Sequence, residues 1–392
     1  MTNLTKLKIK TRDPFDSSIK VPFFLPQITK DDKRFVNNAL SSTLLTDGPK
    51  LRQFESAFAK FTGTKFAIGV SNGTSALHLA LKSTGIGKGD EVIIPDMTFV
   101  ATASAVLLTG ATPVLADVNK EDLNISITSI QKCITNKTKA ILPVHFAGKI
   151  CDISQIKKIS YSNNLAIIED CAHALGARIA GKHAGSFGEV GCFSFYPTKN
   201  ITTIEGGMII TNSKKIAQYV RAARNHGITK SLEQRFSHGK PWDYDVMEPG
   251  YNYRLDEIRS ALGINQLKRI KKINLQRKKT CQYYNSKLKN VKGIITPSIS
   301  SNNDNAFHLY IIRIQKNFGL SRDSLFHKLL KHGIRTSVHY KPLHEFTIFR
   351  KKAKIYDKLE NTKQAYKEII SLPLYLQISR IAQDKVIDCI IN

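Results

Sequence analysis

The order of apolar and polar residues between about residues 50 and 210 predicts strands that alternate with helices. Leu51, Phe54, Phe58 and Phe61 recur at a spacing that places them on one face of a helix, which Gly63 ends. The pattern that follows predicts a strand at 66–70, a turn at 71–74, a helix at 75–83, a strand at 92–94, a helix at 98–108, and buried strands at 114–116, 140–144 and 165–168. This alternation is typical of an α/β fold, in which crossover helices join parallel strands.

The pattern changes in the last third of the chain. It predicts a long basic helix at 255–288, a strand at 308–314, a helix at 321–331, a strand at 335–340 and a final helical segment. We therefore expect two domains, because the elements no longer alternate. Residues 20–255 would form a large α/β domain, and residues 256–392 the long linking helix and a smaller α+β domain.

Ligands of open α/β sheets gather at the carboxyl ends of the strands, so the polar residues that follow each strand are candidates for a site. The turn from Ser71 through Asn72, Gly73 and Thr74 to Ser75 leads from a strand into a helix. Free backbone N–H groups and the helix dipole favour an anion such as a phosphate there. An ordinary capped helix is the alternative, because Ser and Thr are common caps.

Two acidic residues, Glu169 and Asp170, end a strand that should be buried on both faces. A buried carboxylate needs a partner, and a cationic ring nitrogen would supply one. A carboxylate beside a pyridinium keeps the ring protonated and makes it an electron sink. A helix cap or an internal salt bridge is the alternative.

Lys199 lies between an apolar strand that ends near Tyr196 and a glycine-rich turn at Gly206 and Gly207. A lysine in a partly dry site loses some of its preference for the charged form and becomes a nucleophile toward an aldehyde. A surface lysine is the alternative for any single lysine in so basic a chain. The combination of Lys199 with the turn and the carboxylates favours a site.

Two further features are candidates for the same site. Phe99 follows the second predicted strand and would lie flat against an aromatic cofactor or simply pack in the core. The segment 250–254 offers the amide of Asn252 and the guanidinium of Arg254 to an anion just before the long helix.

Taken in order, seven segments resemble the DegT/DnrJ/EryC1/StrS family of sugar aminotransferases over nearly the whole chain. They are VSNGTSALHLAL, GDEVIIPDMTFVATASAV, GATPVLADV, ILPVHFAG, IIEDCAHALGA, GCFSFYPTKNITTIEGGMI and GYNYRLDEIRSALGINQL. The resemblance implies a pyridoxal 5'-phosphate enzyme of the aspartate-aminotransferase type (fold type I), usually a homodimer.

The resemblance also implies roles for individual residues. Lys199 matches the Schiff-base lysine, and Asp170 the partner of the pyridinium nitrogen. Phe99 would stack on the ring, and His173 would lie near the phenolic oxygen of the cofactor. The phosphate would be held by Thr74, Ser75 and Ser194, and by Asn252 from the neighbouring subunit.

The reaction implied is a two-stage transfer in which glutamate gives its amino group and a nucleotide-linked keto sugar then accepts it, with Lys199 moving the proton in each half. Some family members carry His at the lysine position and perform dehydration, which Lys199 argues against. The segments NHGITK and PWDYDVMEPGYNYRL resemble the branch that acts at C4 of UDP-linked 4-keto sugars. Amination at C3, or of another nucleotide sugar or a cyclitol ketone, is the alternative.

The composition adds few constraints. A net charge of +28 would attract anions, and a basic nucleic-acid-binding or regulatory protein on the same fold is the non-enzyme alternative, although no nucleic-acid-binding motif accompanies the charge. Most of the basic residues between 268 and 279 are expected on a solvated helix face.

Neither the cysteines nor the histidines predict a metal site. Six scattered cysteines lack zinc spacing, so reduced thiols are expected. His339 and His344 lack acidic or Cys partners in a ligand pattern and are expected to be ordinary pocket or surface histidines. Residues 1–16 have no apolar segment, and no membrane span is apparent, so we expect a cytoplasmic protein.

Overall fold

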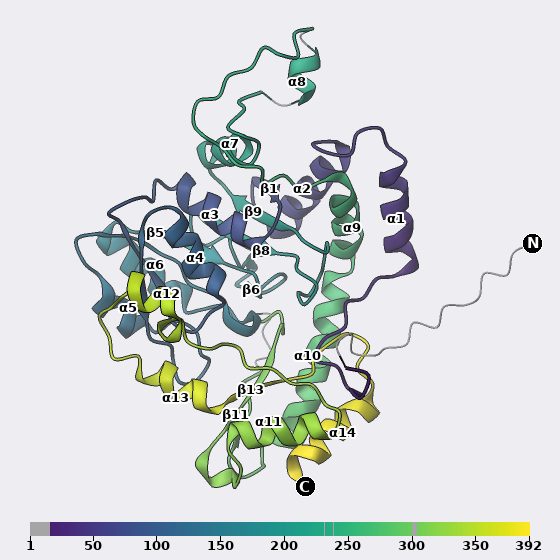
Figure 1. Ribbon diagram of the computed structural model, residues 1–392, viewed down its shortest axis with the longest axis vertical. Helices are drawn as coiled ribbons and strands as arrows, with labels where there is room; N and C mark the ends of the chain where they lie inside the picture. The colour runs from purple at the N-terminus through teal and green to yellow at the C-terminus, as the bar shows by residue number, and fades with distance from the viewer. Residues whose placement is uncertain (1–15, 231, 238, 300–303) are drawn as a thin grey trace, which may run out of the picture.

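A computed structural model describes residues 16–230, 232–237, 239–299 and 304–392, and it places two main sheets at opposite ends of the body (Figure 1). The expectation for the first residues of the chain lies almost entirely outside the described part. The larger sheet has the strand order β1-β9-β8-β5-β4-β2-β3-β12. Its strands are β1 (Phe66–Val70), β2 (Glu91–Pro95), β3 (Thr112–Ala116), β4 (Thr138–Ile141), β5 (Ala166–Asp170), β8 (Val190–Ser194), β9 (Gly207–Thr211) and β12 (Lys354–Ile355).

The predicted strands of the large sheet are present, with small differences in their bounds. The pairs of β2 with β3 and β4, of β4 with β5 and of β5 with β8 are parallel, as the alternating pattern predicted. Strand β9 runs antiparallel to both of its neighbours, β1 and β8. The short strand β12 comes from the last part of the chain and adds a parallel edge beside β3.

Helices cover both faces of the large sheet, because successive side chains of each strand point to opposite faces. Ile93 and Ile167 belong to the apolar cluster on one face, and Ile94 and Ile168 to the cluster on the other. The first face packs against α2 (Pro49–Thr62), α5 (Ile127–Cys133), α6 (Ile153–Asn163) and α9 (Glu257–Lys268). The second face packs against α3 (Gly73–Ser83), α4 (Val100–Leu108) and α7 (Lys214–Ala223).

Local sequence explains where α2 begins and ends. Pro49 occupies its first turn, and Gly63 ends it in the left-handed conformation with a φ of 79°. The buried carboxylate of Glu257, at the start of α9, accepts hydrogen bonds from the N–H groups of Gly48, Lys50 and Leu51 at 3.1, 2.7 and 2.9 Å. This carboxylate thus satisfies the free N–H groups of α2 and joins two helices that lie about two hundred residues apart.

The smaller sheet has the order β10-β11-β13 and is antiparallel throughout. Its strands are β10 (Ile294–Ile295), β11 (Tyr310–Ile314) and β13 (Ile369–Leu372). Side chains from α10 (Ile270–Leu288), α11 (Arg322–Lys331) and α14 (Arg380–Ile391) share a separate apolar cluster with this sheet. The remaining elements are α1 (Lys30–Leu40), α8 (Leu232–Ser237), α12 (Thr347–Lys352), α13 (Glu360–Glu368), the hairpin of β6 (Arg178–Ile179) and β7 (Lys182–His183), and single 3-10 turns at Phe146–Gly148, Lys316–Phe318 and Leu343–Glu345.

The single long basic helix predicted at 255–288 is wrong in two respects. The helix is interrupted at Arg269, whose backbone N–H donates to the Gln266 carbonyl three residues earlier at 3.1 Å, and whose guanidinium binds the buried carboxylate of Asp32 at 2.6 Å. Arg277, expected on a solvated face, is buried instead. Its guanidinium donates to the carbonyl groups of Phe307 and His308 at 2.7 and 2.6 Å. Arg269 and Arg277 therefore connect the helices to distant segments of the chain and do not lie on a solvated face.

The strand predicted at 335–340 is also wrong. Only Ser337 pairs with β13, through two hydrogen bonds with Ser371. The chain then turns toward the large sheet, where the Tyr340 hydroxyl reaches His173. Side-chain contacts with residues beside the large sheet therefore outweigh the β-branched pattern that favoured a strand.

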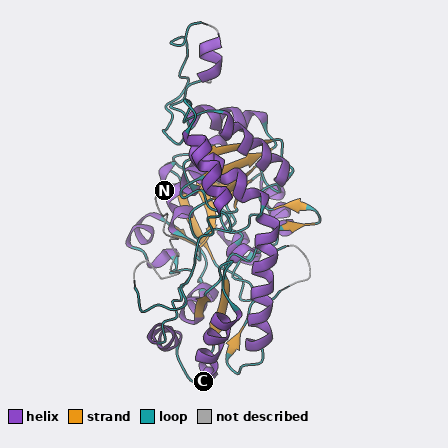
Figure 2. Ribbon diagram, turned by 90° about the vertical axis from the view of Figure 1, so that its right-hand side faces the viewer, coloured by secondary structure: helices purple, strands orange, loops and turns teal. Residues whose placement is uncertain are grey.

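The described residues between 228 and 250 stand out from the body as an arm that carries α8, at the top of both Figure 1 and Figure 2. The base of the arm is held by bridges between Asn225 and Asn252 and between Ile228 and Val246. Gly250 allows the two sides to meet, since a Cβ there would lie 2.0 Å from the Gly227 nitrogen. None of the described helices is long and apolar enough to span a bilayer.

Candidate active site

Asp170 is the last residue of β5 and is 5% exposed. Its Oδ2 accepts a hydrogen bond from the Thr102 hydroxyl at 3.0 Å, and its Oδ1 accepts one from the Ala172 N–H at 3.1 Å. Burial raises the pKa of Asp170, while the Ala172 N–H, the Thr102 hydroxyl and the positive charge of Lys199 act in the opposite direction. The result is an oriented, desolvated carboxylate that favours a cation beside it.

Glu169 precedes Asp170 and points to the other face of the sheet, so it does not share the site. One of its oxygens contacts His145 Nε2 at 2.9 Å and the Gly185 N–H at 2.8 Å. The other accepts from the N–H groups of Phe187 and Gly188 at 2.7 and 2.8 Å. Glu169 is therefore paired with groups inside the protein, as in the alternative interpretation of the two carboxylates.

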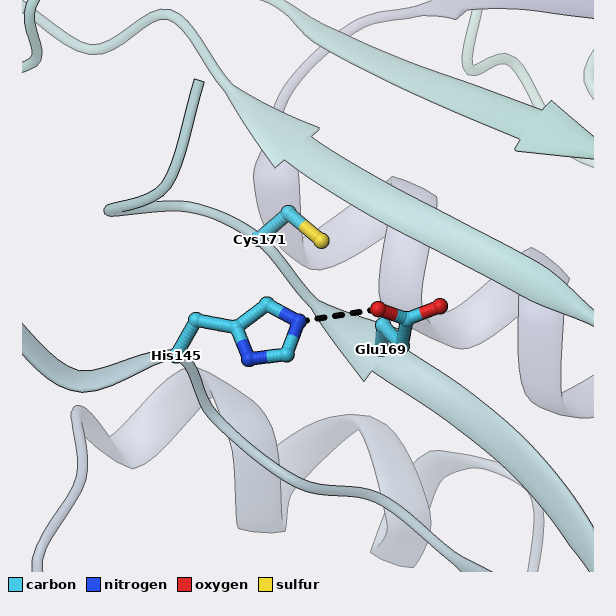
Figure 3. A group of neighbouring side chains, drawn as sticks. All are labelled: His145, Glu169 and Cys171. Carbon is cyan, nitrogen blue, oxygen red and sulfur yellow. Dashed lines mark hydrogen bonds and ion pairs between the residues drawn. The ribbon is translucent and has the colours of Figure 1, made fainter. Parts of the chain in front are cut away.

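His145, Glu169 and Cys171 lie close enough to hold a metal ion (Figure 3), but their chemistry does not favour one. His145 Nδ1 accepts from the Cys151 N–H at 3.2 Å, so the ring hydrogen is on Nε2 and points at Glu169. Burial raises the pKa of the Cys171 thiol well above its usual value, which opposes a thiolate ligand.

The other histidines considered for a metal have protein partners. His344 Nδ1 lies 2.6 Å from Asp96 Oδ2, and His339 Nδ1 lies 2.8 Å from the Ser371 hydroxyl. All six cysteines are free thiols.

Lys199 lies in the loop after β8, where its backbone N–H donates to the Tyr196 carbonyl at 2.9 Å. The residue is partly exposed, yet burial by the surrounding protein lowers the pKa of its amine to about 8, against the attraction of Asp170. Burial and, to a smaller extent, the charge of Lys199 lower the pKa of His173 well below its usual value. The structure thus brings Lys199, Asp170 and His173 together, and it makes the lysine a stronger nucleophile at neutral pH than a solvated one.

The turn after β1 joins Ser194 at the same end of the sheet. Asn72 caps α3, because its Oδ1 accepts from the Ser75 N–H at 2.8 Å and from the Ser75 hydroxyl at 3.0 Å. Gly73 is packed so closely that a Cβ there would lie 2.8 Å from the Ser194 Cβ. At this helix start the N–H groups of Gly73 and Thr74 precede the first intrahelical bond, which suits a phosphate.

Two aromatic residues, Phe99 and Tyr340, also belong to the site. Phe99 precedes α4 and is 55% exposed, and its ring centroid lies 6.0 Å from that of Tyr340. Tyr340 also donates to or accepts from His173 Nε2 at 3.0 Å. The other ring nitrogen of His173, Nδ1, is buried and has no hydrogen-bond partner in the described part of the chain.

Asn252 is exposed and forms a bridge with Asn225. Its neighbour Tyr253 accepts a hydrogen bond from the Ser71 N–H at 2.8 Å, so the segment runs past the turn of its own chain. Arg254 donates to the Asn225 side chain at 2.8 Å. Asn252 is therefore accessible to another molecule.

Three contributors were missed from the sequence. Thr102 follows Phe99 by one helical turn, and this spacing is a signal that could have been used. Tyr340 and His308 come from the last part of the chain, and only the folded structure brings them to His173; the His308 ring lies 4.3 Å from the His173 ring.

Comparison with known proteins identifies the family of this site. The model of the DegT/DnrJ/EryC1/StrS aminotransferase family matches residues 26–391. The chain belongs to this family. This DegT/DnrJ/EryC1/StrS protein is therefore a pyridoxal-phosphate-dependent sugar aminotransferase of fold type I, as its motifs predicted, and the enzyme interpretation replaces the non-catalytic alternative.

Several relatives resemble this aminotransferase along nearly its whole length. The spore coat polysaccharide biosynthesis protein SpsC of Bacillus subtilis is 38% identical over 373 residues, which cover 94% of this chain and 96% of SpsC. Helicobacter pylori PseC, an aminotransferase involved in the biosynthesis of pseudoaminic acid, has 30% identity and a TM-score of 0.87 over 94% of this chain and 98% of PseC. The sugar aminotransferase Spr1654 of Streptococcus pneumoniae, described as putative and solved in its PMP form, has 30% identity and a TM-score of 0.88 over 95% and 98%.

The residues of the aminotransferase site fit pyridoxal phosphate. Asp170 offers a buried carboxylate to a ring nitrogen, and the start of α3 offers backbone N–H groups beside Ser194, where a Cβ at Gly73 would collide with the Ser194 side chain. The unpartnered His173 Nδ1 offers a polar contact to an oxygen of a ligand. Each feature is a property of the chain alone and suits one part of the cofactor.

Proposed function

We propose that this enzyme transfers the amino group of glutamate to the keto carbon of a nucleotide-linked sugar, in the biosynthesis of an amino sugar for a surface glycan. The observation that carries the proposal is the amine of Lys199, whose pKa is lowered to about 8, within the electrostatic reach of the buried Asp170. The relatives SpsC and PseC, named for polysaccharide and pseudoaminic acid biosynthesis, support a sugar substrate.

The residues of the site would divide the work as follows. Thr74, Ser75 and Ser194 would hold the cofactor phosphate, and Phe99 would cover one face of the ring. Asp170 would keep the ring nitrogen protonated, and His173 would contact the phenolic oxygen. Pyridoxal phosphate, when bound, supplies an aldehyde that carries the amino group and a ring that accepts electrons.

Lys199 would be the group that moves the proton. With a pKa of about 8, a useful fraction of its amine is uncharged near neutral pH and can take a proton from the carbon that bears the amino group. In the glutamate half the amine would pass this proton on to the cofactor carbon, and in the second half it would move a proton from the cofactor carbon to the former keto carbon of the sugar. A general base whose pKa lies near the working pH is best suited to both directions.

We infer that the acceptor is a UDP-linked 4-keto sugar that is aminated at C4. The two segments that resemble this branch, at 225–230 and 241–255, lie side by side at the base of the arm, through the Asn225–Asn252 and Ile228–Val246 bridges. They could therefore act as one unit. Amination at C3, or of another nucleotide-linked or cyclitol ketone, is the alternative.

We further propose that the active enzyme is a homodimer in which Asn252 completes the phosphate site of the partner subunit. Its exposure in the single chain supports this arrangement. We also propose that residues 20–255 and 256–392 act as the large and small domains of each subunit, and that the enzyme works in the cytoplasm.

The substrate is tested by incubating the purified enzyme with glutamate and a panel of UDP- and dTDP-linked 3-keto and 4-keto sugars, followed by NMR of the products. An amino group at C4 of a UDP-sugar would support the proposal. A product aminated at C3, or turnover of dTDP-sugars alone, would favour the alternative.

A further inference from the structure

The hydrogen bond between Tyr340 and His173 has no role in the function proposed so far. His173 is 4% exposed, its Nε2 lies 3.0 Å from Tyr340 Oη, and its Nδ1 is buried without a hydrogen-bond partner in the described structure. A buried polar atom without a partner is costly, and its usual explanation is a ligand or water. The Nδ1 atom therefore points to a ligand.

The chemistry of the pair decides which nitrogen of His173 carries the hydrogen. Burial lowers the pKa of His173 well below its usual value, so the ring is neutral and has one N–H. Burial, together with the negative charge of Asp170, raises the pKa of Tyr340, so its phenol keeps its hydrogen. A phenol is a better donor than a neutral imidazole, and an imidazole nitrogen is the better acceptor. Tyr340 therefore donates to Nε2, and the ring hydrogen is on Nδ1.

The surroundings of His173 hold the ring in one orientation. The His308 ring is 4.3 Å away at 32°, and the Tyr340 ring is nearly parallel at 6.1 Å. The charged and titratable groups that act on this cluster are Lys199, Asp170 and His339, and none of them forms a hydrogen bond with Nδ1 in the described part of the chain. Because the His173 ring is held in one orientation, its Nδ1–H donates in one fixed direction.

We propose that Tyr340 is a positioning residue, which holds His173 in the Nδ1–H form so that this N–H donates to the phenolic oxygen of bound pyridoxal phosphate. The proposal rests on the proposed function, in which His173 lies beside that oxygen. Tyr340 itself acts through His173 and need not touch the cofactor.

This arrangement has a spectroscopic consequence. Cofactor joined to Lys199 absorbs visible light, and the band moves to shorter wavelength when the linking nitrogen loses its proton. The negative charge of the phenolic oxygen stabilises the protonated form of the linking nitrogen. A hydrogen bond donated to this oxygen reduces that stabilisation, so the Nδ1–H should lower the pKa of the linking nitrogen. Loss of the Nδ1–H should therefore raise that pKa.

The experiment is a pH titration of the visible spectrum of the holoenzyme, without substrates, for wild type and Tyr340→Phe. Since a hydrogen bond to a charged oxygen corresponds to about one pKa unit or more, the midpoint should rise by about one pH unit in Tyr340→Phe. His173→Asn should raise it as well. Tyr340→Phe should add little in the His173→Asn background, because Tyr340 acts through His173.

Tyr284→Phe is the matched control, because Tyr284 is a buried tyrosine in the small domain whose hydroxyl donates to the Pro373 carbonyl at 3.1 Å. It should lose stability without moving the midpoint. A Tyr340→Phe or His173→Asn curve that superimposes on the wild-type curve would overturn the inference and leave the proposed function standing. A wild-type holoenzyme with no visible band would overturn both.

Discussion

The hydroxyl of Thr102 donates to Oδ2 of Asp170 across 3.0 Å, from the first turn of α4 to the end of β5. Both residues are almost completely buried. Phe99 immediately precedes this turn of α4. The start of α4 therefore positions both the Thr102 hydroxyl that orients Asp170 and the Phe99 ring. The site therefore depends on the packing of α4 against the sheet as well as on the residues that would meet the cofactor.

We predict that Thr102→Val lowers kcat roughly tenfold or more, because a hydrogen bond to a charged group contributes about 1.5–3 kcal/mol. The Asp170 carboxylate would lose one of its two fixed contacts and its orientation. Steady-state kinetics with glutamate and the accepted keto sugar measure the effect. Thr62→Val is the control, since the Thr62 hydroxyl is buried at the end of α2 and bonds only within that region. An equal loss of kcat in both variants would mean that Thr102→Val acts by lowering the stability of the protein and not through Asp170.

Asp170→Asn should leave a folded protein but reduce activity roughly a hundredfold or more, the size of preorganised electrostatic contributions in other enzymes. An amide cannot hold a ring nitrogen in its protonated form. The measurement is the single-turnover rate of the glutamate half of the reaction, with circular dichroism to confirm folding. An unchanged rate would assign Asp170 a structural role only.

The pKa of Lys199 predicts how the stability of the cofactor-free enzyme depends on pH. The value is about 8 in the folded chain and 10.5 for a free lysine, so below pH 8 the amine is charged in both states, and burial then disfavours the folded state. Between about pH 8 and 10.5 the folded state loses the proton first, and stability rises with pH. Lys199→Met should therefore stabilise the cofactor-free enzyme at pH 7, and this gain should shrink as the pH rises toward 10.5.

Urea unfolding from pH 6 to 10 tests this prediction. The exposed Lys271→Met on α10 serves as the control and should change stability little at any pH. A destabilised Lys199→Met protein at pH 7 would show that the charged amine is well compensated in the folded state.

The shared site is tested by subunit exchange between Lys199→Ala and Asn252→Ala proteins. If Asn252 completes the site of the partner, a hybrid dimer has one site with both changes and one site with neither. Activity should then rise above that of either parent. No recovery after exchange has been demonstrated would mean that each site is built from one chain.

The sequence predicted the large sheet well, because buried parallel strands and amphipathic helices leave strong local patterns. Strands β1, β2 and β3 were placed within a residue or two by those patterns. The antiparallel direction of β9 and the edge strand β12 were not foreseen, because direction and pairing depend on partners far away in the chain. The break at Arg269 depends in the same way on Asp32, which lies more than two hundred residues earlier.

In the candidate site too, some residues could be predicted from local sequence and others depend on distant parts of the chain. Lys199, Asp170 and the turn before α3 follow strands directly, so their place at one edge of the sheet could be predicted. The residue pattern alone did not distinguish Glu169 from Asp170; only the family resemblance pointed to Asp170, and the structure places the two carboxylates in different surroundings. Tyr340 was missed because its segment has the composition of a strand and reaches His173 only through tertiary folding.

The central claim is that Lys199 holds the cofactor, and borohydride reduction of the holoenzyme followed by peptide mass spectrometry tests it most directly. Reduction fixes the cofactor permanently to the lysine that carries it. The account predicts a pyridoxyl group on Lys199, no labelled peptide in Lys199→Ala, and loss of activity in proportion to labelling. A label on another lysine of the active wild-type enzyme, or full activity in Lys199→Ala, would contradict it.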